Sequence, residues 1–356
     1  MKLYRIISTL FLLTWVATIL LAQDNNCITS KTFPVKKGTI LRLSNKYGDV
    51  NILTVKDDLL LVCATVTIVQ DDDNLLRKSM KLINISIEKL KDTIYVSTLY
   101  DKKFFSESSR QGRKSFSVDY LIKMPAYLNL SIQDEFGNIS MDELSGSMNV
   151  RLSQGILSAK KLTRGNEKPV SSAYVDHGKI MIDELNWMTL NVYNCSSVNI
   201  GKAQALMITS AISKIKFEEI SSLVSNSKSD NYSIKSVNNL VSECTYSAFE
   251  IEKLNGQLKT KATYGSIRIL NLNKEFRGID IESVQTQISL NTGENVSFRA
   301  DIAITDGSVE FPVNKYPGII RTVDNYSTTL RGTVGIDKEP KSLIRVRATS
   351  GKLTIL

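Results

Sequence analysis

A segment of about 19 residues recurs along most of this chain, and it limits the fold more than any other feature does. Each copy has a small residue followed by apolar residues at the second and fourth positions, which is the period-2 pattern of a strand with one buried face. A second alternating segment lies between successive copies. The pattern is plainest at residues 47–52 (YGDVNI), 136–141 (FGNISM), 177–182 (HGKIMI), 264–269 (YGSIRI) and 306–311 (DGSVEF).

The small residue that opens each copy, here called the anchor, puts the copies in register. From Gly137 to Gly351, eleven intervals span 214 residues, a mean of about 19.5. The residue four positions after the anchor is apolar in every copy except the one with Arg331, and eight consecutive copies have an aliphatic residue seven positions after it. The anchors are Gly48, Gly137, Gly155, Gly178, Ser196, Ser213, Ser233, Ser247, Gly265, Thr286, Gly307, Ser327 and Gly351.

A unit of this size cannot bury its apolar face alone, so successive units must stack. The pattern therefore predicts an all-β fold, a single-chain parallel β-solenoid (β-helix) of about 12 coils over residues 126–356. Successive coils would lie about 4.8 Å apart. We expect the anchor at a corner where the backbone needs positive φ or where a side chain would clash. Each coil would hydrogen-bond to the next, and residues 351–356 would form one more solenoid strand.

Residues 23–125 fit the repeat only at Gly48, and they predict an amino-terminal β-rich cap that covers the first edge of the solenoid. Acidic residues 71–73 precede a helical spacing of apolar residues over 74–83, which predicts one short helix. Residues 101–115 are polar and lack periodicity, so they predict a mobile loop. Residues 117–123 predict a strand that ends at Met124 and Pro125.

The first 22 residues predict a cleaved secretory signal peptide, because Lys2 and Arg5 precede an uncharged apolar run that ends at Ala22. We therefore expect an exported chain in the periplasm, on the outer-membrane surface or outside the cell, not spanning the membrane after cleavage. Cleavage removes two of the charges behind the net charge of +9. The remaining excess favours anionic polysaccharide or lipid head groups over nucleic acid, or a plain solvated surface.

The four cysteines fall into two groups, and export would allow disulfides to form. Cys27 and Cys63 both lie in the predicted cap, and we expect them to be bonded to each other. Cys195 and Cys244 lie about three coils apart, roughly 14 Å, which is farther than a disulfide reaches. These two are expected to be buried free thiols.

Residues of catalytic type have structural explanations in this pattern. His177, the only histidine, occupies a column of packing residues beside an anchor, and tyrosines 232, 246 and 264 are expected to form a stacking ladder. The acidic pairs at 142–143, 183–184 and 218–219 alternate with lysines at 160–161 and 202, which indicates a surface ladder of cross-coil charge pairs. The aspartates at 71–73 fit a helix start better than a calcium loop. We predict no catalytic, metal-binding or cofactor-binding residues.

The segments SFSVDYLIKMP (residues 115–125) and FGNISMDELSG (136–146), with YGDVNI near the expected mature amino terminus, resemble exported bacterial proteins of unknown function. This Bacteroidetes-type family has β-strand repeats and is grouped as adhesins. The resemblance implies a β-solenoid and an envelope location, and it supplies no catalytic residue. We therefore expect a non-enzymatic, adhesin-like binding or scaffold protein. The alternatives are a β-helix polysaccharide lyase or hydrolase, and an assembly partner of another envelope protein.

Overall fold

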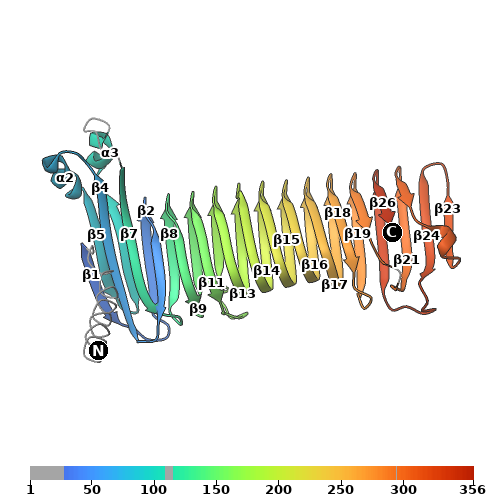
Figure 1. The fold of residues 1–356 in the computed structure, drawn as a ribbon, viewed down its shortest axis with the longest axis horizontal. Helices are drawn as coiled ribbons and strands as arrows, with labels where there is room; N and C mark the ends of the chain where they lie inside the picture. Colours follow the sequence, from blue (N-terminus) through green and yellow to red (C-terminus); the bar gives the residue numbers. More distant parts are fainter. Residues whose placement is uncertain (1–27, 109–114, 294) are drawn as a thin grey trace, which may run out of the picture.

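The computed structural model describes residues 28–108, 115–293 and 295–356. These residues form an elongated, all-β molecule in which 26 strands belong to one large, mostly parallel sheet (Figure 1). The predicted signal peptide and Cys27 lie outside the described residues. Within the described ranges, no helix is both long and apolar enough to cross a membrane.

In the central part, equivalent strands of successive repeats pair in parallel and in register. Ile200 pairs with Phe217, Phe217 with Ile234, and Ile234 with Ile251, and all four side chains are buried. Alternate residues face outward, so each strand buries one face in a continuous apolar interior. These strands are β8 (Asn129–Glu135), β9 (Ile139–Leu144), β10 (Met148–Ser153), β11 (Ile156–Leu162), β12 (Ser172–Asp176), β13 (Lys179–Tyr193), β14 (Ser197–Ala211), β15 (Lys214–Lys228), β16 (Asn231–Thr245), β17 (Ala248–Thr263), β18 (Ser266–Leu272), β19 (Gly278–Val284) and β20 (Gln287–Leu290).

The corners explain why the anchors are small. A Cβ on Gly155 would lie 1.8 Å from the carbonyl oxygen of Gly137, and one on Gly137 would lie 1.9 Å from that of Gly48. The positive φ belongs to the residue before the anchor, for example 60° at Phe136 and 53° at His177. The anchor is thus selected by close backbone approach, and its neighbour adopts the left-handed conformation.

One predicted anchor is wrong, because the residue that follows the positive-φ position Ser229 is Asp230, not Ser233. After the positive-φ position Asn194, Cys195 comes first, but the predicted anchor Ser196 keeps the column, since Ile200, four residues after it, pairs with Ile182 and Phe217. Asp230 is not a small residue, and its carboxylate fits the corner by accepting hydrogen bonds from its surroundings. As a result Ile234, not Val237, occupies the column four residues after the anchor, and Val237 pairs with Ile220 and Leu254.

At the amino-terminal end the strands do not stack in chain order. Strand β2 lies between β6 and β8, and β3 lies between β7 and β9, while β4 pairs antiparallel with β1 and β7. Helix α2 confirms the predicted helix, and the Asp72 carboxylate caps it by accepting from the backbone of Asn74 and Leu75. The elements are β1 (Thr29–Pro34), β2 (Ile40–Lys46), β3 (Val50–Val55), β4 (Leu59–Val69), α2 (Asp73–Met80), β5 (Ile83–Leu90), β6 (Thr93–Tyr100), α3 (Lys102–Ser108) and β7 (Ser115–Pro125).

The segment predicted as a mobile loop, residues 101–115, begins with helix α3. Phe104 of this helix is fully buried, and its ring centroid lies 5.0 Å from that of Tyr100 and 4.8 Å from that of Phe116. These aromatic contacts hold the helix against β6 and β7. Polar residues surround these aromatic residues in the sequence, so the sequence alone does not predict this packing. Residues 109–114 lie outside the described residues.

The carboxyl-terminal end also departs from chain order, although residues 351–356 do contain the predicted strand, which pairs in parallel with its neighbours. Strand β25 lies between β19 and β21, and β26 lies between β20 and β22. Strand β24, which contains the predicted anchor Ser327, runs antiparallel to β21 and β23. The elements are β21 (Phe298–Thr305), β22 (Ser308–Glu310), the 3-10 helix η1 (Val313–Lys315), β23 (Ile319–Val323), β24 (Ser327–Val334), β25 (Leu343–Thr349) and β26 (Lys352–Ile355).

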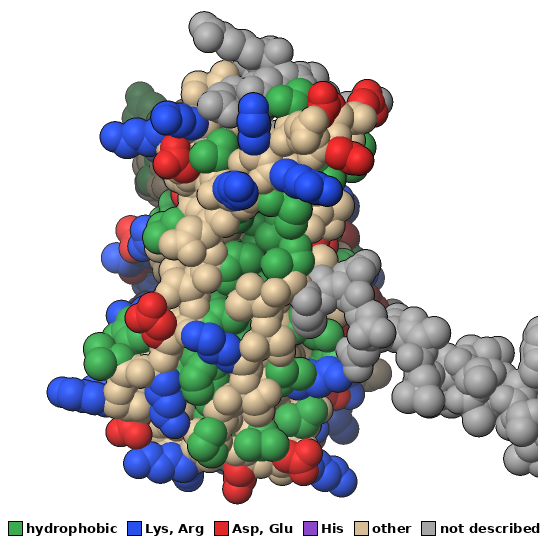
Figure 2. Space-filling view, turned by 90° about the vertical axis from the view of Figure 1, so that its left-hand side faces the viewer, with side chains coloured by type: hydrophobic (Ala, Val, Ile, Leu, Met, Phe, Trp, Pro, Cys, Tyr) green, Lys and Arg blue, Asp and Glu red, His purple; other side chains and the backbone are tan. Residues whose placement is uncertain are grey.

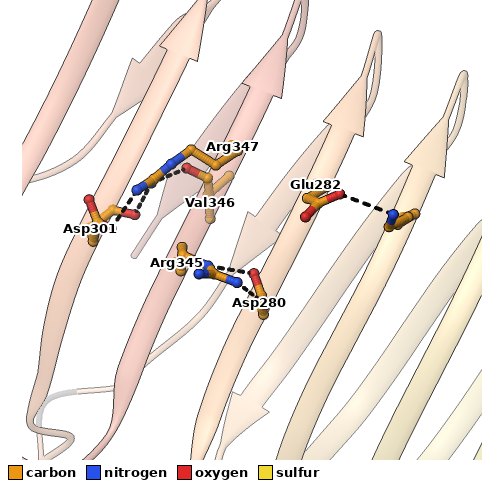
Figure 3. A network of polar contacts seen from close by, with 7 residues as sticks. Asp280, Glu282, Asp301, Arg345, Val346 and Arg347 are labelled. Carbon is orange, nitrogen blue, oxygen red and sulfur yellow. Dashed lines mark hydrogen bonds and ion pairs between the residues drawn. The ribbon is translucent and has the colours of Figure 1, made fainter.

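Arginines on the inserted strand β25 bind both of its neighbours (Figure 3). The Arg345 guanidinium donates to both carboxylate oxygens of Asp280 on β19, at 2.9 and 2.5 Å. Arg347 donates to the carboxylate and the backbone carbonyl of Asp301 on β21, at 2.5 and 2.7 Å. Pairs of this geometry fix register as well as adding stability, so they favour the inserted position of β25.

Candidate functional site

A shallow groove of about 940 Å³ runs across the outer face of the first strands of the coils, and we call it the polar groove. It crosses β14, β15, β16, β17, β18, β20 and β26, which pair in that order and would extend about 29 Å at the usual strand spacing. The outward residues that line it are Ser197, Asn199, Lys214, Lys216, Asn231, Ser233, Ala248, Glu250, Ser266, Arg268, Gln287, Ser289, Lys352 and Thr354.

The groove arises because small and long side chains share the same outward columns. Ser233, Ala248 and Ser266 contribute little height to the floor, whereas Lys216 and Arg268 rise beside them. Parallel pairing places Ser233 in one outward column with Lys216 and Arg268, and Ala248 and Ser266 in the column beside it, so the surface is lower where the small residues lie. The repeat of buried apolar residues does not predict this groove, because the groove lies on the outward positions. The signal was available in the outward positions, which hold serine, asparagine, glutamine and alanine over long stretches.

The lining carries more positive than negative charge, with Lys214, Lys216, Arg268 and Lys352 against Glu250. Three of the four cations are paired, since Lys216 lies 2.7 Å from Glu218, Lys352 lies 2.6 Å from Glu310, and Arg268 lies 3.9 Å from Glu250.

Hydrogen bonds from Lys216 and Lys235 lower the pKa of the Glu218 carboxyl, so Glu218 stays ionised. Within the described residues Lys214 has no ion-pair partner, and it is the cation of the groove that is freest to meet a bound anion.

The acidic pairs predicted as a charge ladder do lie in register with lysines. Glu143 pairs with Lys161, Lys161 with Glu184, Glu184 with Lys202, and Lys202 with Glu219 on successive strands. One residue earlier on the same two strands, the Lys160 ammonium lies 2.7 Å from the Asp142 carboxylate. The register confirms the ladder and accounts for these carboxylates without a chemical role.

His177 does not lie in a packed column. Its side chain is 58% exposed, with Nδ1 2.9 Å from an Asp176 carboxylate oxygen. The other positive-φ residues of this column also point outward, including Tyr246 and Tyr264, whose rings stack at 4.9 Å. Tyr232 is not part of that stack, because it is buried and packs on Phe249 at 4.3 Å. The three-tyrosine ladder was therefore wrong, and the histidine is an exposed corner residue.

The cysteines that face the interior are free, as predicted. Cys195 and Cys244 are buried, and burial raises the pKa of both thiols, that of Cys244 to about 11. Neither thiol opens onto the polar groove. Cys63 is disulfide-bonded. Because Cys27 lies outside the described residues, its pairing with Cys63 stays a prediction.

Two buried aspartates stand out in the interior, both about 1% exposed. Asp230 is well satisfied, because Ser210 Oγ and the backbone N–H groups of Ser213 and Lys228 donate to it. Asp134 has no hydrogen-bond partner of normal geometry for either carboxyl oxygen, and burial raises its pKa to about 8. In the described part of the chain no group of three or more histidine, cysteine, aspartate or glutamate side chains is arranged to hold a metal ion.

Comparison with known proteins gives little further information. No family model matches this chain, and no curated protein matches it. One solved structure, described as a "putative cell adhesion protein" from Clostridium sporogenes ATCC 15579, is similar at 12% identity over 92% of this chain and 98% of that chain, with a TM-score of 0.17. At that TM-score the likeness carries no argument about fold or function, so these are drawn from the residues of this chain.

Proposed function

We propose that this chain is an exported β-solenoid that acts as a non-enzymatic, adhesin-like binding or scaffold protein of the cell envelope. The single observation that carries the proposal is the polar groove, of about 940 Å³, across seven aligned strands. Support for the solenoid comes from the parallel pairing of β13 to β17, which repeats every 17 or 18 residues with one register shift between Val237 and Asn239.

The groove favours an extended anionic polysaccharide as the ligand. A long trough with a floor of small polar residues fits a linear polymer better than a compact molecule, which would need a deeper and more apolar pocket. The excess of lysine and arginine over glutamate in the lining favours negative charge on that polymer. The pairing of the predicted acidic residues with lysines supports a binding role over hydrolysis or elimination, which need carboxylates or bases gathered at one bond.

The test is binding of residues 23–356 to polygalacturonate, with neutral dextran as the reference polymer. Lys214→Glu and Arg268→Glu reverse charge inside the groove, and we expect each to weaken binding several-fold and to reduce its salt dependence. Lys259→Glu is the matched control, because Lys259 is an exposed lysine on the second strand face, beside β19. Equal affinity for both polymers, or equal loss in all three variants, would refute the groove as the contact surface.

Two further measurements separate this proposal from its alternatives. Release of unsaturated products or reducing ends from the polysaccharide would establish an enzyme instead. Protease treatment of intact cells, compared with cells whose outer membrane is opened, tests location. Cleavage on intact cells supports a surface protein, whereas protection until opening supports a periplasmic scaffold and demotes adhesion.

A further inference from the structure

Strand β23 ends the sheet at the carboxyl-terminal side of the molecule (Figure 1). Its sheet partner is β24, with Ile319 opposite Gly332 and Val323 opposite Thr328. Every residue from 320 to 326 is exposed, including Ile320 at 72%, Val323 at 62% and Tyr326 at 73%. A strand at the edge of a sheet presents unpaired backbone donors and acceptors, which can pair with another chain.

The hydrogen bonds of the hairpin show which residues of β23 face outward. Thr333 N–H donates to Gly318, and Asp324 N–H donates to Ser327, so the even-numbered residues of β23 bond to β24. In an antiparallel pair the residues between them direct their backbone groups away from the partner strand. Arg321 and Val323 therefore each present a free N–H and a free C=O. None of these four groups has a hydrogen-bond partner among the described residues.

The edge strands at the other end of the molecule are protected. On β5, the carbonyl of Ile87 accepts a hydrogen bond from Lys31 Nζ at 2.6 Å, and Lys89 Nζ donates to Pro34 on β1 at 2.9 Å. Lysine and proline on an edge are known to discourage strand pairing. Figure 2 shows this end, where charged side chains surround a seam of apolar ones. A head-to-tail chain of molecules would need this guarded end, so β23 needs a different partner.

The four free groups of β23 are complementary to those of a second β23. If Arg321 of one copy lies opposite Val323 of the other across a two-fold axis, each free N–H meets a free C=O, which gives four bonds. This register also avoids placing the two Arg321 side chains opposite each other, an arrangement that like charges disfavour. The apolar side chains of Ile320 and Val323 would lose exposed area in the same contact.

We propose that two copies of this chain join end to end through antiparallel pairing of β23, with Arg321 opposite Val323 of the second copy. The contact is isologous, so it closes as a dimer and does not propagate into a fibre. The dimer doubles the length of the molecule and places the two polar grooves in tandem. This interaction is independent of the ligand of the groove.

Sedimentation of residues 23–356 should show a concentration-dependent mixture of monomer and dimer. Val323→Pro removes one donor from each copy, and proline is accepted on an edge where the N–H faces solvent. We expect it to weaken dimerisation roughly tenfold or more, because two of the four bonds are lost. Val323→Ile keeps the backbone N–H and an apolar side chain, so it is the control and should leave dimerisation unchanged.

A disulfide trap tests the register directly. Thr322 would lie opposite Thr322 of the second copy in a non-hydrogen-bonded pair, about 4.5 Å apart at Cα, so Thr322→Cys should crosslink into dimers on mild oxidation. Ile320→Cys is the control, because its two copies would lie about 13 Å apart. Monomer at every concentration, or crosslinking of Ile320→Cys as fast as Thr322→Cys, would overturn the proposal.

Discussion

Replacing Asp134 with asparagine should stabilise this protein at neutral pH and change its pH dependence. The Asp134 carboxyl is about 1% exposed, and its oxygens lack normal hydrogen-bond partners. Burial is the main cause of its raised pKa, and the negative charges of Asp49, Glu135 and Asp119 add to it, while the backbone of Glu135 opposes it. The folded chain therefore keeps this group protonated and neutral through most of the accessible pH range.

The size of the effect follows from the pKa difference. The pKa is about 8 in the folded chain against an ordinary value of 3.8 in the unfolded chain, so below pH 3.8 both states are protonated and the group costs nothing. As pH rises above 3.8, the unfolded chain ionises and the folded chain does not, so stability falls until pH passes 8. At about 1.4 kcal/mol per pH unit, the cost at pH 7 is about 4 kcal/mol.

Asparagine has nearly the same shape as the protonated acid and does not ionise, so Asp134→Asn should recover most of that cost. The assay is urea denaturation of the wild type and variant at pH 4, 6 and 8. The two proteins should be similar at pH 4 and should diverge steadily toward pH 8, with the variant more stable. Parallel pH profiles would refute the reasoning, because they would mean that Asp134 does not titrate abnormally.

Asp230→Asn is the matched control, since Asp230 is equally buried but accepts three hydrogen bonds. Burial raises the pKa of Asp230 as well, so removing its charge also relieves a cost, but an amide NH₂ in place of one carboxylate oxygen would face donors and cost about 1–3 kcal/mol. We therefore expect Asp230→Asn to gain clearly less stability at pH 7 than Asp134→Asn.

Three further results are expected. Leu185→Asp buries an unpaired charge at a site 3% exposed and should cost several kcal/mol of folding stability in the same urea titration. Glu184→Ala on the exposed charge ladder should cost about 1 kcal/mol or less. Similar small effects from both variants would mean that the register is wrong. Arg345 lowers the pKa of Asp280 in the folded chain, so the pair adds stability above the unfolded pKa, and this stability is lost as pH falls through the folded pKa. Arg345→Gln should therefore flatten the dependence of stability on pH below pH 4. An unchanged pH dependence in that range would argue against the pair. Deleting residues 343–356 removes β25 and β26 from between other strands and should expose the segment after Leu290 to proteases; a truncated chain with wild-type resistance would contradict the strand order.

The sequence predicts the repeating interior well because one period governs it. Buried residues such as Phe217 and Ile251 recur at the same distance from a corner, and stacking in parallel keeps them in one column. The rule that a small residue occupies each corner failed where hydrogen bonding, and not small size, lets a residue fit. At Asp230 a charged residue takes a corner by bonding to Ser213 and Lys228, and this depends on neighbours that are adjacent only after folding.

The groove could not be predicted from the buried pattern for a related reason. Outward residues such as Ser233 and Ala248 do not stabilise the interior, so they show no strong periodicity. Their importance appears once parallel pairing brings Ser233 into one column with Lys216 and Arg268 and places Ala248 in the column beside it. Helix α3 is also hard to predict from the sequence, because the contact of Phe104 with Tyr100 forms only when β6 and β7 lie beside the helix.

The strand order at the two ends follows from a constraint that no local pattern contains. A coil at the end of a stack has one neighbour, so it loses half of its pairing energy and frays easily. Here β2 and β3 near the start of the chain, and β25 and β26 near its end, each lie between two other strands inside the stack.

Strands β25 and β26 can then detach only by separating from strands on both sides. Edge positions fall instead to hairpins from within the chain, β5 with β6 at one end and β23 with β24 at the other. Such hairpins are closed by tight turns and tolerate an exposed edge better than a free terminus does. The open edge of β23, on which the proposed dimer depends, is thus a consequence of burying the carboxyl terminus.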